Sequence, residues 1–134
     1  MLMVSVLIIS RTEIANSFAY CLEHILNKRV DNLVILPVKK TEASDVIQKR
    51  AQEIVERQLQ KAAGVLILSD IFGATPSNIA AKLVIPGKVE LITGINLPML
   101  LRAISYSAAD LATCVAKSLE GGINGIIHIK ESEV

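Results

Sequence analysis

The sequence predicts an open, doubly wound α/β fold, in which a mostly parallel sheet is flanked by helices on both faces. Three observations support this prediction. The 134 residues suit one domain, which we expect to span residues 1–134. Short runs rich in Val, Ile and Leu alternate with longer amphipathic stretches. The short runs are apolar throughout rather than at every second residue, which is typical of parallel strands buried on both faces.

The apolar runs mark the expected strands. Five segments have this character: residues 4–9, 33–36, 65–69, 89–93 and 125–129. The second run stops at Pro37, which has no backbone N–H for a neighbouring strand. The pair Lys39-Lys40 that follows is interpreted as a solvated turn. Right-handed crossovers between successive strands would place helices on both faces of one sheet.

Two long helices are expected in the first half of the chain. In residues 13–26 and 41–61, apolar side chains recur every three or four positions, as on one face of a helix. Gly64 is expected to mark the end of the second helix.

Capping residues mark three further helices. Thr75-Pro76 is expected to start one, with Thr as the cap and Pro at the first helical position. Asn96 precedes the next, and Ser107-Ala108-Ala109-Asp110 resembles a capping box for the last. Gly121-Gly122 is expected to end that last helix.

Composition narrows the classes of function. The 14 Lys and Arg residues nearly balance the 13 Asp and Glu residues, so we expect no basic face for nucleic acid. The two cysteines form no CxxC motif and no Cys/His cluster, and we expect neither a metal nor a cofactor. No apolar run approaches the ~20 residues of a membrane span, and the N-terminus lacks the basic start of a signal peptide. We therefore expect a cytoplasmic protein that does not insert into a membrane.

Three loops are the candidate functional segments. In doubly wound sheets, ligands bind outside the carboxyl ends of the strands. Residues 10–13, 70–75 and 94–96 follow the first, third and fourth expected strands. Gly73 allows a tight turn, and the helix after it would point free N–H groups at the same crevice. One interpretation is an anion site for a phosphoryl group, and the other is a simple turn capped by Asp70.

Arg11 and Thr12 are further candidates at this edge of the sheet. Arg11 can bind an anion or pair with Asp70, and pairing is the simpler interpretation. Thr12 is a candidate hydroxyl acceptor, although no general base is visible beside it in the sequence. His24 falls in an expected helix and His128 in an expected strand, and both are interpreted as structural or solvated residues.

Two longer motifs resemble those of a known family. Residues 69–78 read Ser-Asp-Ile-Phe-Gly-Ala-Thr-Pro-Ser-Asn, and residues 94–100 read Gly-Ile-Asn-Leu-Pro-Met-Leu. In this order they resemble the two signatures of the mannose-type EIIA components of the bacterial phosphoenolpyruvate-dependent sugar phosphotransferase system (PTS). The opening strand, the Pro86-Gly87 turn and Gly121-Gly122 also fall in register, so the resemblance covers essentially the whole chain.

The resemblance implies a cytoplasmic phosphoryl carrier that works near a membrane permease complex. In this family a histidine after the first strand accepts phosphate from the phosphocarrier HPr and passes it to an EIIB partner. The residue matching Asp70 orients that histidine, and the hydroxyl residue matching Thr75 helps to hold the phosphoryl group. The resemblance also implies a homodimer, with exchange of a C-terminal strand in the region of residues 125–129.

The first loop departs from the family pattern. That pattern is Thr/Ser-His-Gly followed by an acidic or polar residue, and here the chain reads Ser10-Arg11-Thr12-Glu13. Arg11 thus stands where the phosphoacceptor histidine is expected, and it stays protonated at physiological pH. We assign the catalytic positions to Arg11 and Asp70. We assign phosphate binding to Thr12, Gly73, Ala74 and Thr75.

Two functions follow from these assignments. The resemblance favours an EIIA component that is regulatory or impaired in phosphotransfer, and it leaves open whether the chain is an enzyme. The alternative is a non-enzymatic domain that binds an anion or a partner on a flavodoxin-like sheet. A phosphocarrier that uses Thr12 or Asp70 as acceptor ranks below both, because a phosphorylated Asp normally requires a metal held by further carboxylates.

Overall fold

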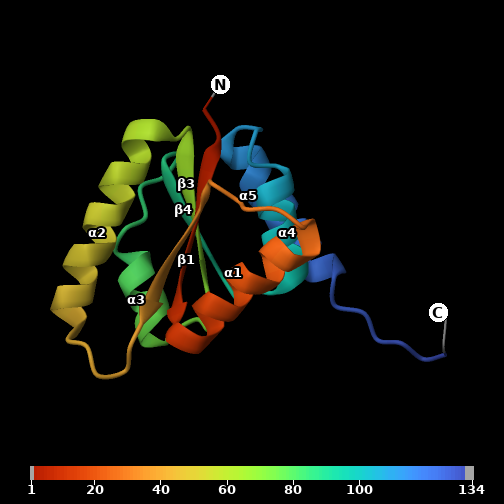
Figure 1. The fold of residues 1–134 in the computed structure, drawn as a ribbon, viewed down its shortest axis with the longest axis horizontal. Coiled ribbons are helices and arrows are strands. Elements are labelled where there is room, and N and C mark those ends of the chain that lie inside the picture. Colours follow the sequence, from red (N-terminus) through yellow and green to blue (C-terminus); the bar gives the residue numbers. More distant parts are fainter. Residues whose placement is uncertain (1, 132–134) are drawn as a thin grey trace.

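A four-stranded parallel sheet lies between two layers of helices in the computed structural model, which describes residues 2–131 (Figure 1). The strands are β1 (Val4–Arg11), β2 (Leu33–Val38), β3 (Gly64–Ser69) and β4 (Val89–Thr93). Their order is β2-β1-β3-β4, and every neighbouring pair is parallel. The expected doubly wound α/β fold is confirmed, with the switch point between β1 and β3.

The helices divide unequally between the two faces (Figure 1). Two helices, α2 (Ser44–Lys61) and α3 (Thr75–Ala81), pack on one face. The other face carries α1 (Thr12–Leu26), α4 (Leu97–Ser105) and α5 (Leu111–Asn124). Successive strand residues point to opposite faces, so Leu7 and Ile9 pack toward α2 while Val6 and Ile8 pack toward α1. Two apolar layers on one strand explain the unbroken apolar runs.

The expected strand at residues 125–129 is not formed. These residues extend away from the body of the molecule and are exposed (Figure 1). A strand requires a neighbouring strand to accept its backbone hydrogen bonds. In the described part of this single chain, no segment pairs with the tail, and β4 is left as a sheet edge. The apolar pattern was therefore insufficient to predict a strand here.

Two glycines expected to end α5 instead lie inside it. A Cβ atom on Gly121 would collide with Arg102 Cγ and lie 3.1 Å from the Pro98 carbonyl oxygen of α4. A Cβ on Gly122 would lie 2.8 Å from Met99 Cε. The glycine pair therefore allows α5 to pack closely on α4, and this packing outweighs the low helix propensity of glycine.

Several caps also differ from expectation. Asp110, rather than Ser107, caps α5, since its Oδ1 accepts a 2.7 Å hydrogen bond from the Thr113 N–H. The N-cap of α3 is Ala74, and Thr75 is the first helical residue. Gly64 begins β3 rather than ending α2. The cap of α4 is as expected: Asn96 accepts from the Met99 N–H at 2.9 Å.

Candidate functional site at the carboxyl edge of the sheet

The three expected loops meet at one edge of the sheet. The Arg11 N–H donates to Asp70 Oδ2 at 3.2 Å, which joins the end of β1 to the loop after β3. The loop after β4 joins them, because the Gly94 N–H donates to the Asp70 carbonyl at 2.7 Å. The Ile95 N–H donates to the Ser69 carbonyl at 3.0 Å. The convergence expected from a parallel sheet is thus observed.

The Asp70 side chain links the end of β1 to the loop after β3. Its side chain is buried, and Oδ1 accepts a 2.7 Å hydrogen bond from the Ile71 N–H while Oδ2 accepts from Arg11. Among residues 2–131, its carboxylate forms no ion pair with a guanidinium. The expected pairing with the Arg11 side chain is therefore wrong: the backbone of Arg11 makes the contact, and its guanidinium forms no ion pair with any residue from 2 to 131.

A buried pair of hydroxyls fixes the loop between β3 and α3. Ser77 Oγ donates to the Ile71 carbonyl at 2.6 Å. Because a hydroxyl has one hydrogen, Ser69 Oγ must donate in the 3.0 Å contact between the two serines. Gly73 sits at the tip with φ +89°, a conformation that side chains other than glycine adopt at a cost. These hydrogen bonds and the backbone conformation of Gly73 therefore fix the conformation of the loop between β3 and α3.

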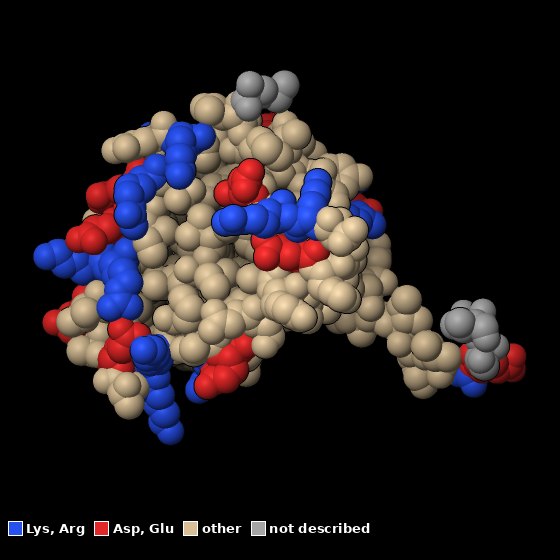
Figure 2. Space-filling model, in the orientation of Figure 1, with Lys and Arg blue, Asp and Glu red and all other residues tan. Residues whose placement is uncertain are grey.

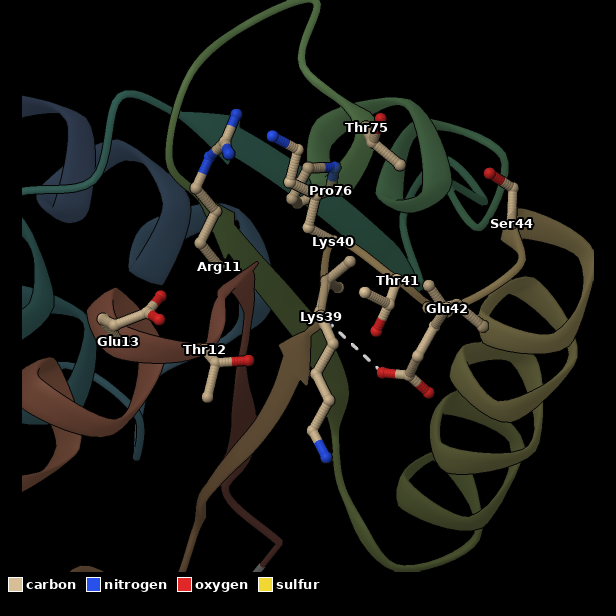
Figure 3. Close-up of a pocket in the computed structure, with 12 residues that line it drawn as sticks. Arg11, Thr12, Glu13, Lys39, Lys40, Thr41, Glu42, Ser44, Thr75 and Pro76 are labelled. Carbon is tan, nitrogen blue, oxygen red and sulfur yellow. Dashed lines mark hydrogen bonds between the residues drawn. The ribbon is translucent and has the colours of Figure 1, made fainter.

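A cavity of about 740 Å³ opens beside these loops (Figure 3). It lies between the start of α1, the segment from β2 to α2 and the start of α3. Three basic residues contribute to its lining: Arg11, Lys39 and Lys40. Four hydroxyl residues do the same: Thr12, Thr41, Ser44 and Thr75. The combination suits an anionic, hydrogen-bonding ligand.

The cavity includes only part of the predicted site. Arg11, Thr12 and Thr75 line it, whereas Asp70, Gly73 and Ala74 are not among its lining residues. The Thr12 hydroxyl oxygen exposes less than 1 Å² and has no hydrogen-bond partner in the described chain. In this conformation the hydroxyl oxygen is not accessible to a phosphoryl group, so the structure lends no support to Thr12 as an acceptor.

Sequence reasoning missed the segment after β2. The strand register pairs Arg11 with Val38, so Lys39 and Lys40 leave the sheet directly beside Arg11. Glu42 accepts a hydrogen bond from the Lys39 N–H at 3.3 Å (Figure 3) and forms an ion pair with the Arg50 guanidinium at 2.9 Å. These two bonds hold the pKa of Glu42 below its ordinary value. The signal was available: Lys39-Lys40 follows a strand in a parallel sheet, as the other three loops do.

Neither histidine belongs to this site. His24 is exposed on α1, where its ring stacks on Tyr20 with 6.2 Å between centroids. His128 is exposed in the C-terminal tail.

Within residues 2–131, no cluster of three or more His, Cys, Asp or Glu residues could hold a metal ion. No helix of that range is long and apolar enough to cross a membrane.

The chain resembles known proteins over most of its length. The family model EIIA-man, PTS system fructose IIA component, matches residues 5–119. The PTS system fructose-specific EIIA component of Bacillus subtilis is 33% identical over 76 residues, which are 56% of this chain and 51% of that protein. The PTS system mannose-specific EIIAB component of Escherichia coli K12 is 30% identical over 95 residues, 69% of this chain and 29% of that protein. The chain thus spans about half or less of these relatives.

Solved structures share the whole fold. The mannose/sorbose specific IIA subunit of Enterococcus faecalis matches with a TM-score of 0.83 at 19% identity, over 99% of both chains. A PTS IIA protein associated with the fucose utilization operon of Streptococcus pneumoniae matches with a TM-score of 0.84 at 20% identity, over 97% of both chains. At these identities the likeness establishes the fold. The match to the family model covers most of the sequence, and the chain therefore belongs to the EIIA-man family of the phosphotransferase system.

Proposed function

We propose that this chain is an EIIA component with a regulatory role, impaired in phosphotransfer. The observation that carries the proposal is Arg11 at the end of β1, clasped through its backbone to Asp70. By the resemblance of the first loop to the family pattern, Arg11 stands where the phosphoacceptor histidine is expected. Phosphoryl transfer needs a nucleophilic lone pair, and a protonated guanidinium has none to give.

Other residues at this edge are poor substitutes for the histidine. The Thr12 hydroxyl is buried. Each Asp70 oxygen accepts a backbone N–H, and no cluster of carboxylates within residues 2–131 could hold the metal that an acyl phosphate normally requires. Phosphotransfer through either group would need a rearrangement of the loop.

The loop after β3 supports the proposed partners, an HPr-like phosphocarrier and an EIIB component. Ile71 is 66% exposed and Phe72 is 86% exposed, directly after Asp70. Large apolar side chains at a loop tip are typical of contact residues in protein interfaces. A Phe72→Ala variant should therefore weaken binding to either partner, measured by calorimetry, while its thermal unfolding stays unchanged.

The C-terminal tail supports the proposed homodimer. Ile126, Ile127 and Ile129 are 77%, 71% and 64% exposed, and the tail carries no charge before Lys130 (Figure 2). The β4 edge has unpaired backbone groups that an exchanged strand would satisfy. Light scattering at several concentrations tests this: an Ile127→Lys variant should shift the chain toward a monomer. From its family membership, we propose that the protein acts in the cytoplasm beside a membrane permease.

The phosphotransfer proposal has a direct test. The protein is incubated with phosphoenolpyruvate, the general PTS phosphotransferase and HPr, and its intact mass is measured. We expect no added phosphoryl group on the wild-type chain, and acid-labile phosphate on Arg11→His. A further Asp70→Asn change should reduce that gain. A phosphoryl group on the wild-type chain, mapped near the end of β1, would overturn the proposal; a His24→Gln/His128→Gln variant serves as the control for adventitious labelling.

The second candidate function is a non-enzymatic anion-binding domain. The cavity with its three basic residues favours it. Binding to HPr and EIIB distinguishes the two candidates, because only the EIIA component should bind them.

A further inference from the structure

Three cationic residues, Arg11, Lys39 and Lys40, line the cavity described above. Arg11 ends β1 and pairs in register with Val38 of β2, so Lys39 and Lys40 follow one and two residues beyond that pair. Figure 3 shows the Arg11 and Lys40 side chains extending in the same direction, and Lys39 in the opposite one. Parallel strand pairing therefore fixes where these cations emerge.

The positive charge here is poorly compensated. Within residues 2–131, none of the three basic side chains forms an ion pair. The cavity has two acidic lining residues, Glu13 and Glu42, and Glu42 is already bonded to Arg50. Like charges brought close together repel one another, and a bound anion would remove that repulsion. The net charge of the cavity thus favours an anionic ligand.

Hydroxyl groups extend the site beyond what a lone anion needs. Thr41, Ser44 and Thr75 are exposed and line the same cavity. Ser44 is also the first residue of the 18-residue helix α2, whose positive end therefore borders the cavity. A volume of about 740 Å³ lies in the range of sites for small organic molecules and far exceeds the need of inorganic phosphate.

We propose that this cavity reversibly binds a small, hydroxyl-bearing phosphate monoester. The phosphate would lie between Arg11 and Lys40, and the hydroxyl groups of the ligand would bond to Thr41, Ser44 and Thr75. A monoester carries close to two negative charges at neutral pH, which matches the uncompensated cations. No bond to phosphorus forms or breaks. The inference rests on the proposed function in one respect, that Arg11 is a binding residue and not an acceptor.

Calorimetry of the full chain tests the inference, with glucose 6-phosphate as the probe. We expect saturable binding with one site per chain, weaker binding of inorganic phosphate and none of glucose. Binding should weaken as salt is added, because surface charges are screened. No saturable binding of glucose 6-phosphate overturns the inference. Equal affinity for inorganic phosphate overturns the part that concerns the organic group.

Charge-matched variants locate the site. Lys40→Gln and Arg11→Gln should each weaken glucose 6-phosphate binding about tenfold, the loss of one charged hydrogen bond. Lys61→Gln makes the same charge change at the other end of α2, about 25 Å away, and should leave binding unchanged. If Lys40→Gln and Lys61→Gln weaken binding equally, the effect comes from the net charge of the protein and not from this cavity, and the inference is overturned.

The two proposals fail in distinguishable ways. Intact mass after incubation with glucose 6-phosphate alone should not change, because binding is noncovalent. If the wild-type chain gains a phosphoryl group from HPr, the proposed function is wrong. The calorimetric titration still tests independently whether the cavity binds glucose 6-phosphate. Amide chemical-shift changes on titration should concentrate in residues 11–13 and 39–44, and changes confined elsewhere would overturn the placement.

Discussion

Thr12→Val should stabilise the protein, although most substitutions destabilise proteins. The Thr12 hydroxyl oxygen exposes less than 1 Å² and has no hydrogen-bond partner within the described chain. Valine places a methyl group where the hydroxyl was, at nearly the same volume. The folded state would then no longer bury an unbonded polar oxygen.

The magnitude follows from the desolvation of that oxygen. A buried polar group without a partner costs about 1–3 kcal/mol. Valine at the first position of α1 loses little helix propensity relative to threonine. We expect a net gain of about 1 kcal/mol. For 134 residues the unfolding entropy is about 0.28 kcal/mol/K, so Tm should rise by about 3–4 °C.

Thermal and urea unfolding provide the measurement. The urea midpoint should rise with an unchanged m-value, which would indicate a change in stability rather than in the denatured state. Thr41→Val is the matched control, because Thr41 is exposed and its hydroxyl is solvated; its Tm should change little. A Tm for Thr12→Val that falls below that of the control would refute the reasoning, and would mean that the hydroxyl makes a bond in solution.

Three further predictions concern packing, thiol reactivity and pH. Gly121→Ala should destabilise the chain by about 1–3 kcal/mol in urea unfolding, because the new Cβ collides with Arg102; an unchanged midpoint would contradict the close packing of α4 and α5. Burial raises the pKa of the Cys114 thiol, so a thiol reagent should label Cys21 in the native protein and Cys114 only after unfolding. The Thr113 N–H and side chain hold the pKa of Asp110 below its ordinary value. Asp110→Ala should therefore lower Tm at pH 7. The difference from wild type should start to shrink below about pH 4, where the carboxyl group of the unfolded chain protonates, and should be lost only as pH falls through the lower pKa of the folded state.

The carboxyl edge of the sheet was predictable because it follows from topology. Once unbroken apolar runs indicate a parallel sheet, the loops after successive strands must meet. The bonds from Arg11 and Gly94 to Asp70 show that they do. The partner of the Asp70 carboxylate was not predictable in the same way. Sequence places Arg11 nearby, but only the backbone course decides whether its N–H or its guanidinium reaches the carboxylate.

Other features depend on contacts that local sequence does not encode. Lys39-Lys40 has the composition of a solvated turn, and only its register beside Arg11 makes it part of a cavity wall. Gly121-Gly122 has the composition of a helix stop, and only the approach of α4 shows that its role is packing. Residues 125–129 have a strand-like pattern, but within the described chain they pair with no strand, and the β4 edge is left open. The first two errors came from contacts distant in sequence, and the third came from the lack of a pairing strand.

At residue 11, the backbone serves the fold and the side chain is available for chemistry. The bond to Asp70 uses the backbone N–H of Arg11, so a change of side chain leaves this bond intact. The guanidinium is exposed and forms no ion pair within residues 2–131, so its removal breaks no ion pair that stabilises the fold. Arg11→His should therefore unfold within about 0.5 kcal/mol of the wild type, as exposed substitutions usually do. A larger loss of stability would show that the side chain supports the fold. In that case, phosphorylation of the Arg11→His variant could no longer be used to test the site.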